Sequence, residues 1–378
     1  MNSITKYDYL CKKYKSSTIK CEICDGNEFT DYNKIGRISV AGSYGVLPVV
    51  ICKNCSYTYQ NPRYSDEFYR EYYKILYREV AFGSKAPSDT YINLQEIRGK
   101  NILDYLTKKG YITGQTRILD HGCASGNTMK PFEEAKLNIR GIDPHEPSVE
   151  QGKKNGRNIS LAGGEELPFD NKSLDLIVSL GSLEHVYDIN QSMKEISRVL
   201  SDEGILFARW RSNKIWGSPY EFYNHNHYRF FTLNTWEFIL NKFNIQLIDS
   251  SFSEIEGLTG AAYIIAKKTS KNINFKEKIE NFDTKKEIKS RINYLKTKKT
   301  DASKYFKEFL DFAEVNKFDN KVIYESIHNN SKNKANYKLL FGIPEEVVPR
   351  AILEAQRYQK GFSMDKKISN NFKDYEII

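Results

Sequence analysis

The chain has 378 residues and carries 57 Lys and Arg against 48 Asp and Glu, a net charge of +9. Such a length suits roughly two to three domains that bury their cores without disulfides. No apolar run approaches the roughly 20 residues of a membrane span, and the N-terminus lacks a signal-peptide core, so we expect a cytoplasmic protein. Residues 271–378 carry 23 basic and 16 acidic side chains (+7), whereas residues 1–270 carry 34 and 32 (+2). The basic excess therefore belongs to the last quarter and does not mark the whole chain for nucleic acid.

Two Cys-x-x-Cys pairs lie near the N-terminus: Cys21 with Cys24, and Cys52 with Cys55, separated by 27 residues. Each pair places two thiolates on one side of a tight turn, and two such turns supply the tetrahedral sulfur ligands that Zn²⁺ accepts. Two disulfides or redox-active dithiols are the alternatives. The expected compartment disfavours disulfides, and a redox motif needs only one pair. We predict a zinc ribbon over 1–62 whose metal is structural, because four protein ligands close the site.

A helical linker is predicted over 63–109. It begins with a Tyr-rich helix at 68–77 and continues with a second helix at about 90–108. We expect the aromatic stripe to pack helices rather than to bind a ligand.

From residue 117, short apolar strands alternate with amphipathic helices. Strands are predicted at 117–120, 139–143, 174–180 and 204–210, with a helix at about 191–200. This alternation predicts an α/β fold with a doubly wound, mostly parallel sheet. Apolar stretches at 245–248 and 261–266 are expected to form a closing hairpin. The domain then spans 110–268, and a helical, Lys-rich region without a visible catalytic motif follows over 269–378.

A glycine-rich turn follows the first of these strands. It reads Asp120-x-Gly122-x-Ala124-x-Gly126, and Asp143 ends the next strand. Loops at the carboxyl ends of parallel strands form the crevice where such sheets bind ligands. Glycines let the backbone approach a ligand, and an acid at the place of Asp143 can accept both hydroxyls of a ribose. The spacing differs from the G-x-G-x-x-G fingerprint of dinucleotide sites.

Four segments resemble the class I S-adenosylmethionine (SAM)-dependent methyltransferases in order and spacing. They cover residues 118–127, 141–144, 165–178 and 183–186. The resemblance implies a Rossmann-like fold in which the glycine-rich turn wraps the methionine part of SAM, the acid ending the second strand holds the ribose, and the turn at 164–166 lies by the adenine. The cofactor-binding residues expected from it are Asp120, Gly122, Cys123, Ala124, Gly126, Asp143, Pro144, Glu165, Glu166 and Leu180.

This sequence departs from the family at two of these places. Ala124 stands where the family usually has glycine, and Gly163 stands where an acid often contacts the adenine amine, so Glu165 is expected to substitute. Cys123 is expected to pack in the loop rather than to act as a nucleophile.

The whole arrangement also resembles the zinc-ribbon methyltransferases of bacterial sugar and polysaccharide pathways, including deoxysugar C-methyltransferases. The two cysteine pairs, Asn61-Pro62-Arg63 and the Tyr-Tyr helix carry this resemblance. So does the segment 225–232, which begins His225-Asn226-His227 where the deoxysugar group has His-Glu-His. In that group the Glu-His pair belongs to the base machinery near a keto-sugar, so Asn226 weighs against C-methylation.

Methyl transfer to a hydroxyl benefits from a general base, and transfer to a carbon beside a ketone requires one. The candidates are His185, which follows a strand end on the cofactor side, and His225 and His227, which share one face if that segment is extended. A structural role is the alternative for each histidine taken singly. Residues just upstream could line the acceptor pocket, with ordinary loop packing as the alternative: Tyr220, Glu221 and Tyr223.

These features predict a SAM-dependent methyltransferase with a structural zinc ion that acts on a small molecule. The expected acceptor is a nucleotide-linked sugar or glycan precursor, with O-methylation ahead of C- or N-methylation. One alternative is an RNA or protein methyltransferase that grips its substrate with the ribbon and basic tail. The charges of the ribbon nearly cancel, which disfavours nucleic acid. A second alternative is a SAM-binding scaffold without catalysis.

Overall fold

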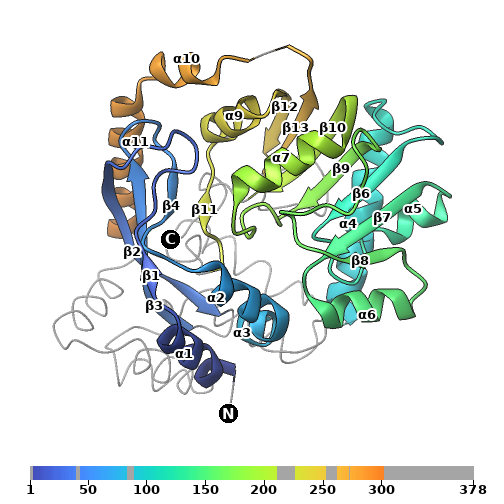
Figure 1. Ribbon diagram of the computed structural model, residues 1–378, viewed down its shortest axis with the longest axis horizontal. Coiled ribbons are helices and arrows are strands. Elements are labelled where there is room, and N and C mark those ends of the chain that lie inside the picture. The colour runs from blue at the N-terminus through green and yellow to red at the C-terminus, as the bar shows by residue number, and fades with distance from the viewer. Residues whose placement is uncertain are drawn as a thin grey trace.

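The computed structural model describes residues 3–39, 43–82, 89–210, 226–252, 262–271 and 273–301. Figure 1 shows a large sheet flanked by helices and, beside it, a smaller sheet formed mainly by the N-terminal part of the chain. Among these residues no helix combines the length and apolar character needed to cross a bilayer.

The large sheet has seven strands in the order β12-β13-β10-β9-β6-β7-β8. Neighbours from β10 to β8 are parallel, and β13 is antiparallel to both of its neighbours. The mostly parallel sheet and the closing hairpin are therefore confirmed. The strands are β6 (Arg117–His121), β7 (Asn138–Asp143), β8 (Ile159–Leu161), β9 (Leu174–Leu180), β10 (Leu200–Trp210), β12 (Ile245–Phe252) and β13 (Ala262–Lys268).

Helices cover both faces of this sheet (Figure 1). On β9, Leu174 and Ile177 belong to one apolar cluster while Leu176 and Val178 belong to another, so the strand is buried on both sides. The first cluster includes residues of α7 (Ile189–Val199) and α9 (Leu233–Lys242), and the second includes residues of α4 (Asp89–Lys108), α5 (Lys130–Glu134) and α6 (Glu146–Lys154). Chain order reverses between β6 and β9, and a sheet of this kind binds ligands at that reversal.

The smaller sheet has the order β11-β4-β3-β2. Its strands are β2 (Phe29–Ser39), β3 (Ser43–Cys52), β4 (Thr58–Gln60) and β11 (Arg229–Phe230). The last of these comes from the region predicted for the methyltransferase domain, yet it pairs with β4 beside the cysteine pairs. Nearby, β1 (Ser16–Ser17) pairs with β5 (Arg63–Tyr64), and α1 (Ser3–Lys13) precedes them.

The Lys-rich region begins with α10 (Phe275–Glu280), which packs against α9, and continues with α11 (Thr284–Asp301), which lies beside the smaller sheet (Figure 1). Ile288 and Ile292 pack against the apolar side chains of that sheet, and the buried Arg291 donates to the Ser56 carbonyl oxygen at 2.6 Å. Residues 302–378, which complete this predicted region, lie outside the described part of the chain.

The Tyr-rich helix is continuous but changes type. An α-helical turn, α2 (Asp66–Glu71), leads into a π-helical segment, η1 (Tyr72–Leu76), and then into α3 (Tyr77–Phe82). Phe68, Tyr69 and Tyr72 are buried in an aromatic cluster, which confirms the predicted packing role for these three residues of the stripe. π-Helical turns are rare and often mark functional sites.

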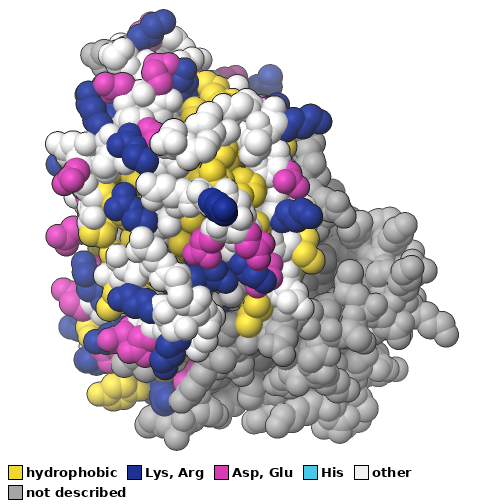
Figure 2. Space-filling model, turned by 90° about the vertical axis from the view of Figure 1, so that its right-hand side faces the viewer, with side chains coloured by type: hydrophobic (Ala, Val, Ile, Leu, Met, Phe, Trp, Pro, Cys, Tyr) yellow, Lys and Arg dark blue, Asp and Glu magenta, His cyan; other side chains and the backbone are white. Residues whose placement is uncertain are grey.

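Figure 2 shows the face formed by the large sheet and its helices. Among the described residues on this face, basic and acidic side chains are interspersed and form no continuous basic patch. This agrees with the near-neutral balance of residues 1–270.

Candidate functional site

The four predicted cysteine ligands form one cluster. The sulfur atoms of Cys21 and Cys55 are 3.5 Å apart, those of Cys24 and Cys52 are 3.6 Å apart, and all four lie within 4.8 Å of one another. No disulfide joins them. Zinc–sulfur bonds of about 2.3 Å in a tetrahedron require sulfur–sulfur distances of about 3.8 Å. The cluster therefore has the dimensions of a tetrahedral zinc site.

The two Cys-x-x-Cys turns share one backbone geometry. In each, the residue after the second cysteine has a positive φ (58° at Asp25, 60° at Ser56). Its N–H donates to the carbonyl oxygen of the first cysteine, at 2.9 Å in one turn and 3.0 Å in the other. The N–H of Asn54 also points to the sulfur of Cys52, at 3.4 Å. Each turn thus presents its two thiols on the same side, as metal binding requires.

The predicted cofactor loop leaves β6 through three positions of positive φ. They are Gly122 (78°), Ala124 (52°) and Gly126 (72°). A Cβ on Gly122 would lie 2.4 Å from the Cβ of Ser182, and one on Gly126 would lie 2.6 Å from Cδ of Arg157. Both positions therefore need glycine. Ala124 adopts a left-handed conformation that favours glycine, which explains why its presence is a departure from the family.

Asp143 ends β7 directly beside this loop. Its carboxylate accepts the N–H of Ala124 and the N–H of His145, each at 2.8 Å. Burial raises the pKa of Asp143 to about 6, although these two bonds oppose the rise. The loop and the acid are thereby fixed to each other, while the neighbouring Pro144 is exposed.

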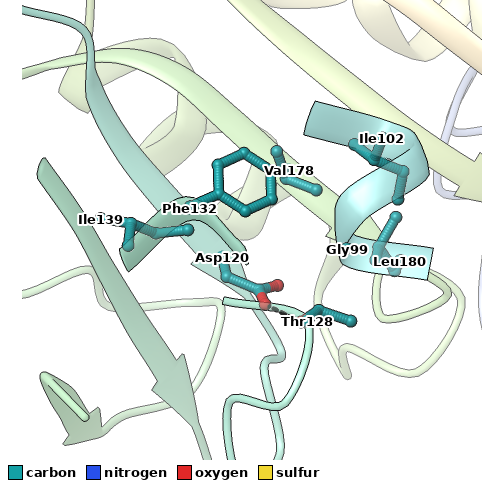
Figure 3. Close-up of a pocket in the computed structure, with 8 residues that line it drawn as sticks. All are labelled: Gly99, Ile102, Asp120, Thr128, Phe132, Ile139, Val178 and Leu180. Carbon is teal, nitrogen blue, oxygen red and sulfur yellow. Dashed lines mark hydrogen bonds between the residues drawn. The ribbon is translucent and has the colours of Figure 1, made fainter. Parts of the chain in front are cut away.

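Asp120 lies beneath the loop, at the edge of a narrow pocket between α4 and the sheet (Figure 3). Its carboxylate accepts a short hydrogen bond from the Thr128 hydroxyl. Burial raises the pKa of Asp120 to about 7. The other residues that line the pocket are Gly99, Ile102, Phe132, Ile139, Val178 and Leu180. Apart from Asp120 and Thr128 the lining is apolar, so this pocket is a continuation of the core beside the predicted cofactor-binding Leu180.

The buried Cys123 packs in the loop as expected. A Cβ on Gly141 would lie 2.5 Å from its sulfur. Burial raises the pKa of the Cys123 thiol, so the protonated, unreactive form predominates.

The predicted adenine-side residues differ in their contacts. Oε1 of Glu165 accepts the N–H of Tyr187 at 2.7 Å and that of Asp188 at 3.3 Å, while Glu166 is exposed. Glu165 therefore also holds the start of the segment that follows His185. Its expected contact with the adenine remains a prediction.

The sequence did not single out His121, whose ring lies against Gly164 of the same turn. Ser182 donates its hydroxyl proton to the His121 carbonyl oxygen at 2.7 Å, so His121 Nδ1 donates to that hydroxyl at 2.9 Å. The lone pair is then on Nε2, which has no hydrogen-bond partner among the described residues and would lie 2.7 Å from a Cβ on Gly164. Burial lowers the pKa of His121 to about 4, so it is neutral at physiological pH.

Two of the three predicted base candidates, His185 and His227, are in contact. The ring centroids of His185 and His227 are 4.6 Å apart, in an edge-to-face arrangement. The side chain of His227 is buried, with 4% of its surface exposed. One ring nitrogen of each histidine and a carboxylate oxygen of the buried Glu184 all lie within 4.8 Å of one another.

A tyrosine that the sequence did not single out completes this group. The hydroxyl of Tyr73 is 2.8 Å from Nδ1 of His185 and donates to the Asn226 carbonyl oxygen at 3.1 Å. Tyr73 lies in the π-helical turn, and its ring and that of Tyr77 are both about 6 Å from the His185 ring (6.1 and 6.0 Å). The sequence did not distinguish Tyr73 from its neighbours in the Tyr-rich helix, because those neighbours have packing roles.

Four predicted site residues lie outside the described part of the chain: His225, Tyr220, Glu221 and Tyr223. The pairing of His225 with His227 on one face, and the acceptor-lining role of the other three, stay predictions.

Comparison with known proteins identifies the central part of the chain. Residues 119–208 match a family described as a methyltransferase domain. A ubiquinone/menaquinone biosynthesis C-methyltransferase of Campylobacter jejuni is 29% identical over 105 residues, which cover 25% of this chain and 45% of that protein. A ubiquinone biosynthesis O-methyltransferase of Pelagibacter ubique is 32% identical over 96 residues, which cover 24% and 40%. The chain thus spans less than half the length of these curated relatives.

A solved SAM-dependent methyltransferase of Methanosarcina mazei aligns with 44% of this chain and 98% of its own, at 20% identity and a TM-score of 0.37. The family match covers the strand, turn and acid that form the predicted cofactor site, and it ends within β10. This chain contains a class I SAM-dependent methyltransferase domain.

Proposed function

We propose that the protein transfers the methyl group of SAM to a hydroxyl of a small-molecule acceptor, most favourably a nucleotide-linked sugar or glycan precursor. The His185–His227 pair would supply the general base. The observation that carries this proposal is the contact between two histidines and a tyrosine hydroxyl, from separate segments, in a part-buried place at the carboxyl-end side of the sheet.

The hydrogen bonds of Tyr73 suggest one tautomer of neutral His185. We assign the single hydroxyl proton of Tyr73 to the bond with the Asn226 carbonyl, and on that assignment Tyr73 accepts from Nδ1–H of His185. This places the basic lone pair of His185 on Nε2. The tyrosine therefore selects the tautomer and the orientation of the ring, as a third group does in many base-assisted transfers.

SAM supplies an electrophilic methyl group on a positively charged sulfur. As the acceptor oxygen bonds to that carbon, the carbon–sulfur bond breaks and its electron pair stays on sulfur. The hydroxyl proton passes to the histidine nitrogen. The chain's own contribution is to position the acceptor and to remove this proton in a site with little water.

The choice of acceptor rests on three supports. The sequence resembles zinc-ribbon methyltransferases of sugar pathways. Tyr73 and Tyr77 present aromatic rings beside His185, and such rings suit the apolar faces of a sugar ring. Asn226, a neutral amide, replaces the glutamate of the deoxysugar C-methyltransferases, which favours an oxygen acceptor over carbon.

We also propose that the cysteine cluster holds a structural zinc ion. The sulfur separations and the matching backbone of the two turns support it. The four thiolates would fill all tetrahedral positions, so this ion would stabilise the ribbon and take no part in the chemistry.

An RNA or protein acceptor receives less support. The first cysteine turn faces the rest of the protein: the Glu22 carbonyl oxygen accepts from the Asn190 amide at 2.8 Å and from Lys242 Nζ at 3.2 Å. Arg291 of the basic helix is buried against the same module. These groups are used internally rather than offered to a macromolecule.

The test is incubation of the full chain with methyl-labelled SAM and a panel of sugar nucleotides, followed by mass spectrometry of the products. We expect a methylated sugar nucleotide and its loss in His185→Gln and His227→Gln, by about 10² to 10⁴ in kcat, with SAM affinity retained. Unchanged turnover in both variants would overturn the base assignment. SAM binding without transfer to any acceptor would favour the scaffold alternative.

A further inference from the structure

One carboxylate of the ribbon lies between the cysteine cluster and the histidine pair. Glu22 occupies the first x of Cys21-x-x-Cys24, and its side chain is 11% exposed. Two arginines hold it from opposite parts of the sequence: Arg63, just after the ribbon, and Arg229, in β11. Their side chains are 2% and 0% exposed.

Both arginines bind the carboxylate through two nitrogens. Arg63 donates from Nη1 to Oε1 at 2.9 Å and from Nη2 to Oε2 at 3.1 Å. Arg229 donates from Nη2 to Oε1 at 2.5 Å and from Nε to Oε2 at 3.1 Å. The Tyr57 hydroxyl adds a fifth donor to Oε2 at 3.1 Å. Paired guanidinium bonds of this kind fix direction as well as distance.

The remaining hydrogen bonds of the two arginines reach the backbone beside both histidines. Arg229 donates to the carbonyl oxygens of Val186 and Tyr187, the two residues after His185; the second bond is 2.6 Å. Arg63 donates to the Tyr187 carbonyl at 3.4 Å and to the Tyr228 carbonyl, next to His227, at 3.3 Å. The Tyr228 N–H also donates directly to the Glu184 carbonyl oxygen at 3.0 Å. The segments that carry the two histidines are therefore joined by this backbone bond and, through the two arginines, by one carboxylate.

We propose that Glu22 is a positioning residue for methyl transfer. Held in place by the cysteine turn, it fixes Arg63 and Arg229, and these hold the backbone that follows His185 and His227. The ribbon then sets the geometry of the catalytic base in addition to stabilising the protein. The effect resembles that of groups that orient a metal ligand without touching the metal, whose loss typically costs about 10- to 100-fold in activity.

This inference rests on the proposed function, because positioning matters only if the two histidines act on an acceptor. The test therefore has one arm that needs no acceptor. It uses the full chain with zinc bound, and it compares Glu22→Gln with a matched control, Asp175→Asn. Asp175 is also a carboxylate held through two nitrogens by an arginine, Arg117 (2.9 and 2.8 Å), but it lies at the amino ends of β6 and β9, away from both histidines.

Glu22→Gln leaves two buried guanidinium groups without their counter-ion, and this can prevent folding. The double variant Glu22→Gln/Arg63→Gln reduces that problem, because it leaves one buried guanidinium instead of two and keeps the net charge of the group at +1. It still removes the carboxylate link between the segments. Elemental analysis of zinc content shows whether the variant has bound zinc, and SAM affinity measured by calorimetry shows whether it is folded.

In the first arm, the imidazole nitrogen resonances are recorded with S-adenosylhomocysteine bound. We expect the signals of His185 and His227 to shift in the Glu22 variants and not in Asp175→Asn, while those of His121 stay in place. In the second arm, we expect kcat to fall by about 10- to 100-fold with the KM for SAM within about twofold of wild type.

Unmoved imidazole signals in a zinc-loaded Glu22 variant would overturn the inference. So would full turnover, or a loss of turnover explained by an equal loss of zinc or of SAM affinity. If the wild-type chain transfers no methyl group to any acceptor, the proposed function fails, and the first arm still decides whether Glu22 positions the histidines.

Discussion

All but Leu180 of the residues expected to bind SAM lie between Asp120 and Glu166, whereas the groups around His185 come from separate stretches of the chain. The predicted cofactor side uses the ends of β6 and β7 and nearby turns. The proposed acceptor side joins Tyr73 of the π-helical turn, His185 after β9 and His227 before β11. Glu22 of the predicted ribbon is linked through its arginines to the two histidine segments. The first half depends on local sequence, and the second depends on docking of the ribbon.

Removing zinc should produce the largest difference between the cofactor side and the acceptor side. Treatment with a chelator, or Cys52→Ser, is expected to lower the melting temperature by at least about 10 °C and to abolish turnover, because the ribbon carries the tie between the histidine segments. Calorimetry should still detect SAM binding. Cys11→Ser, which alters a cysteine outside the cluster, is the control and should change neither quantity appreciably. Loss of SAM binding together with zinc would show that the two halves are not separable.

Tyr73→Phe should damage only the acceptor side. Without the hydroxyl, Nδ1 of His185 loses its acceptor and the ring loses its fixed tautomer, so we expect kcat to fall by about 10- to 100-fold with SAM affinity unchanged. Steady-state kinetics with labelled SAM measure this effect. Tyr69→Phe, in the same aromatic cluster, should retain the wild-type kcat. An equal loss in both variants would indicate that the cluster matters through packing alone.

The pH dependence of SAM affinity should test the cofactor side. The pKa of Asp143 is raised to about 6 by burial, and only the carboxylate accepts from both ribose hydroxyls, so affinity should fall by about tenfold per pH unit below pH 6. Asp143→Asn should bind weakly with a flat profile, and Asp120→Asn should keep the slope. A wild-type profile that stays flat down to pH 5 would refute this role.

Lowering the pH should weaken SAM binding but increase the contribution of the two buried acids to the free energy of unfolding. Because burial raises the pKa values of Asp120 and Asp143 to about 7 and about 6, the folded protein without SAM binds more protons than the unfolded chain between about pH 4 and 7. The contribution of these acids to stability therefore falls as pH rises through that range.

The smallest effect concerns backbone strain in the cofactor loop. Ala124→Gly should raise the free energy of unfolding by about 0.5–1 kcal/mol, because it relieves a φ of 52°. Lys172→Gly relieves the same strain at an exposed residue whose φ is 55°. It should raise the free energy of unfolding by a similar amount. Only Ala124→Gly should also change SAM affinity, as calorimetry would show. Equal SAM affinity in both would mean that the loop tolerates the alanine without cost to binding.

Much of the fold could be predicted because strands buried on both faces appear as short apolar runs. β9 begins and ends at the predicted residues, and Gly122 and Gly126 lie where the turn needs them. The cysteine cluster could be predicted from spacing, because each turn is local.

The pairing of β11 with β4 could not be predicted, since two residues carry no periodic signal. The role of Tyr73 could not be predicted either, because it depends on a π-helical turn and on contacts with residues more than 100 positions away. Glu22 and Arg229 are 207 positions apart, and nothing in either local sequence indicates their ion pair.

The strand β11 also has a consequence for the order in which the protein is made. Gln60 in β4 donates to the His227 carbonyl oxygen, a contact between residues 167 positions apart. At about 5–20 residues per second of synthesis, the ribbon waits about 10–30 s for the strand that completes its sheet. By that time, both cysteine pairs have been synthesised for many seconds and are available to bind metal. The nascent ribbon could bind metal before the histidine pair exists, and the edge of β4 needs protection from other chains in the interval.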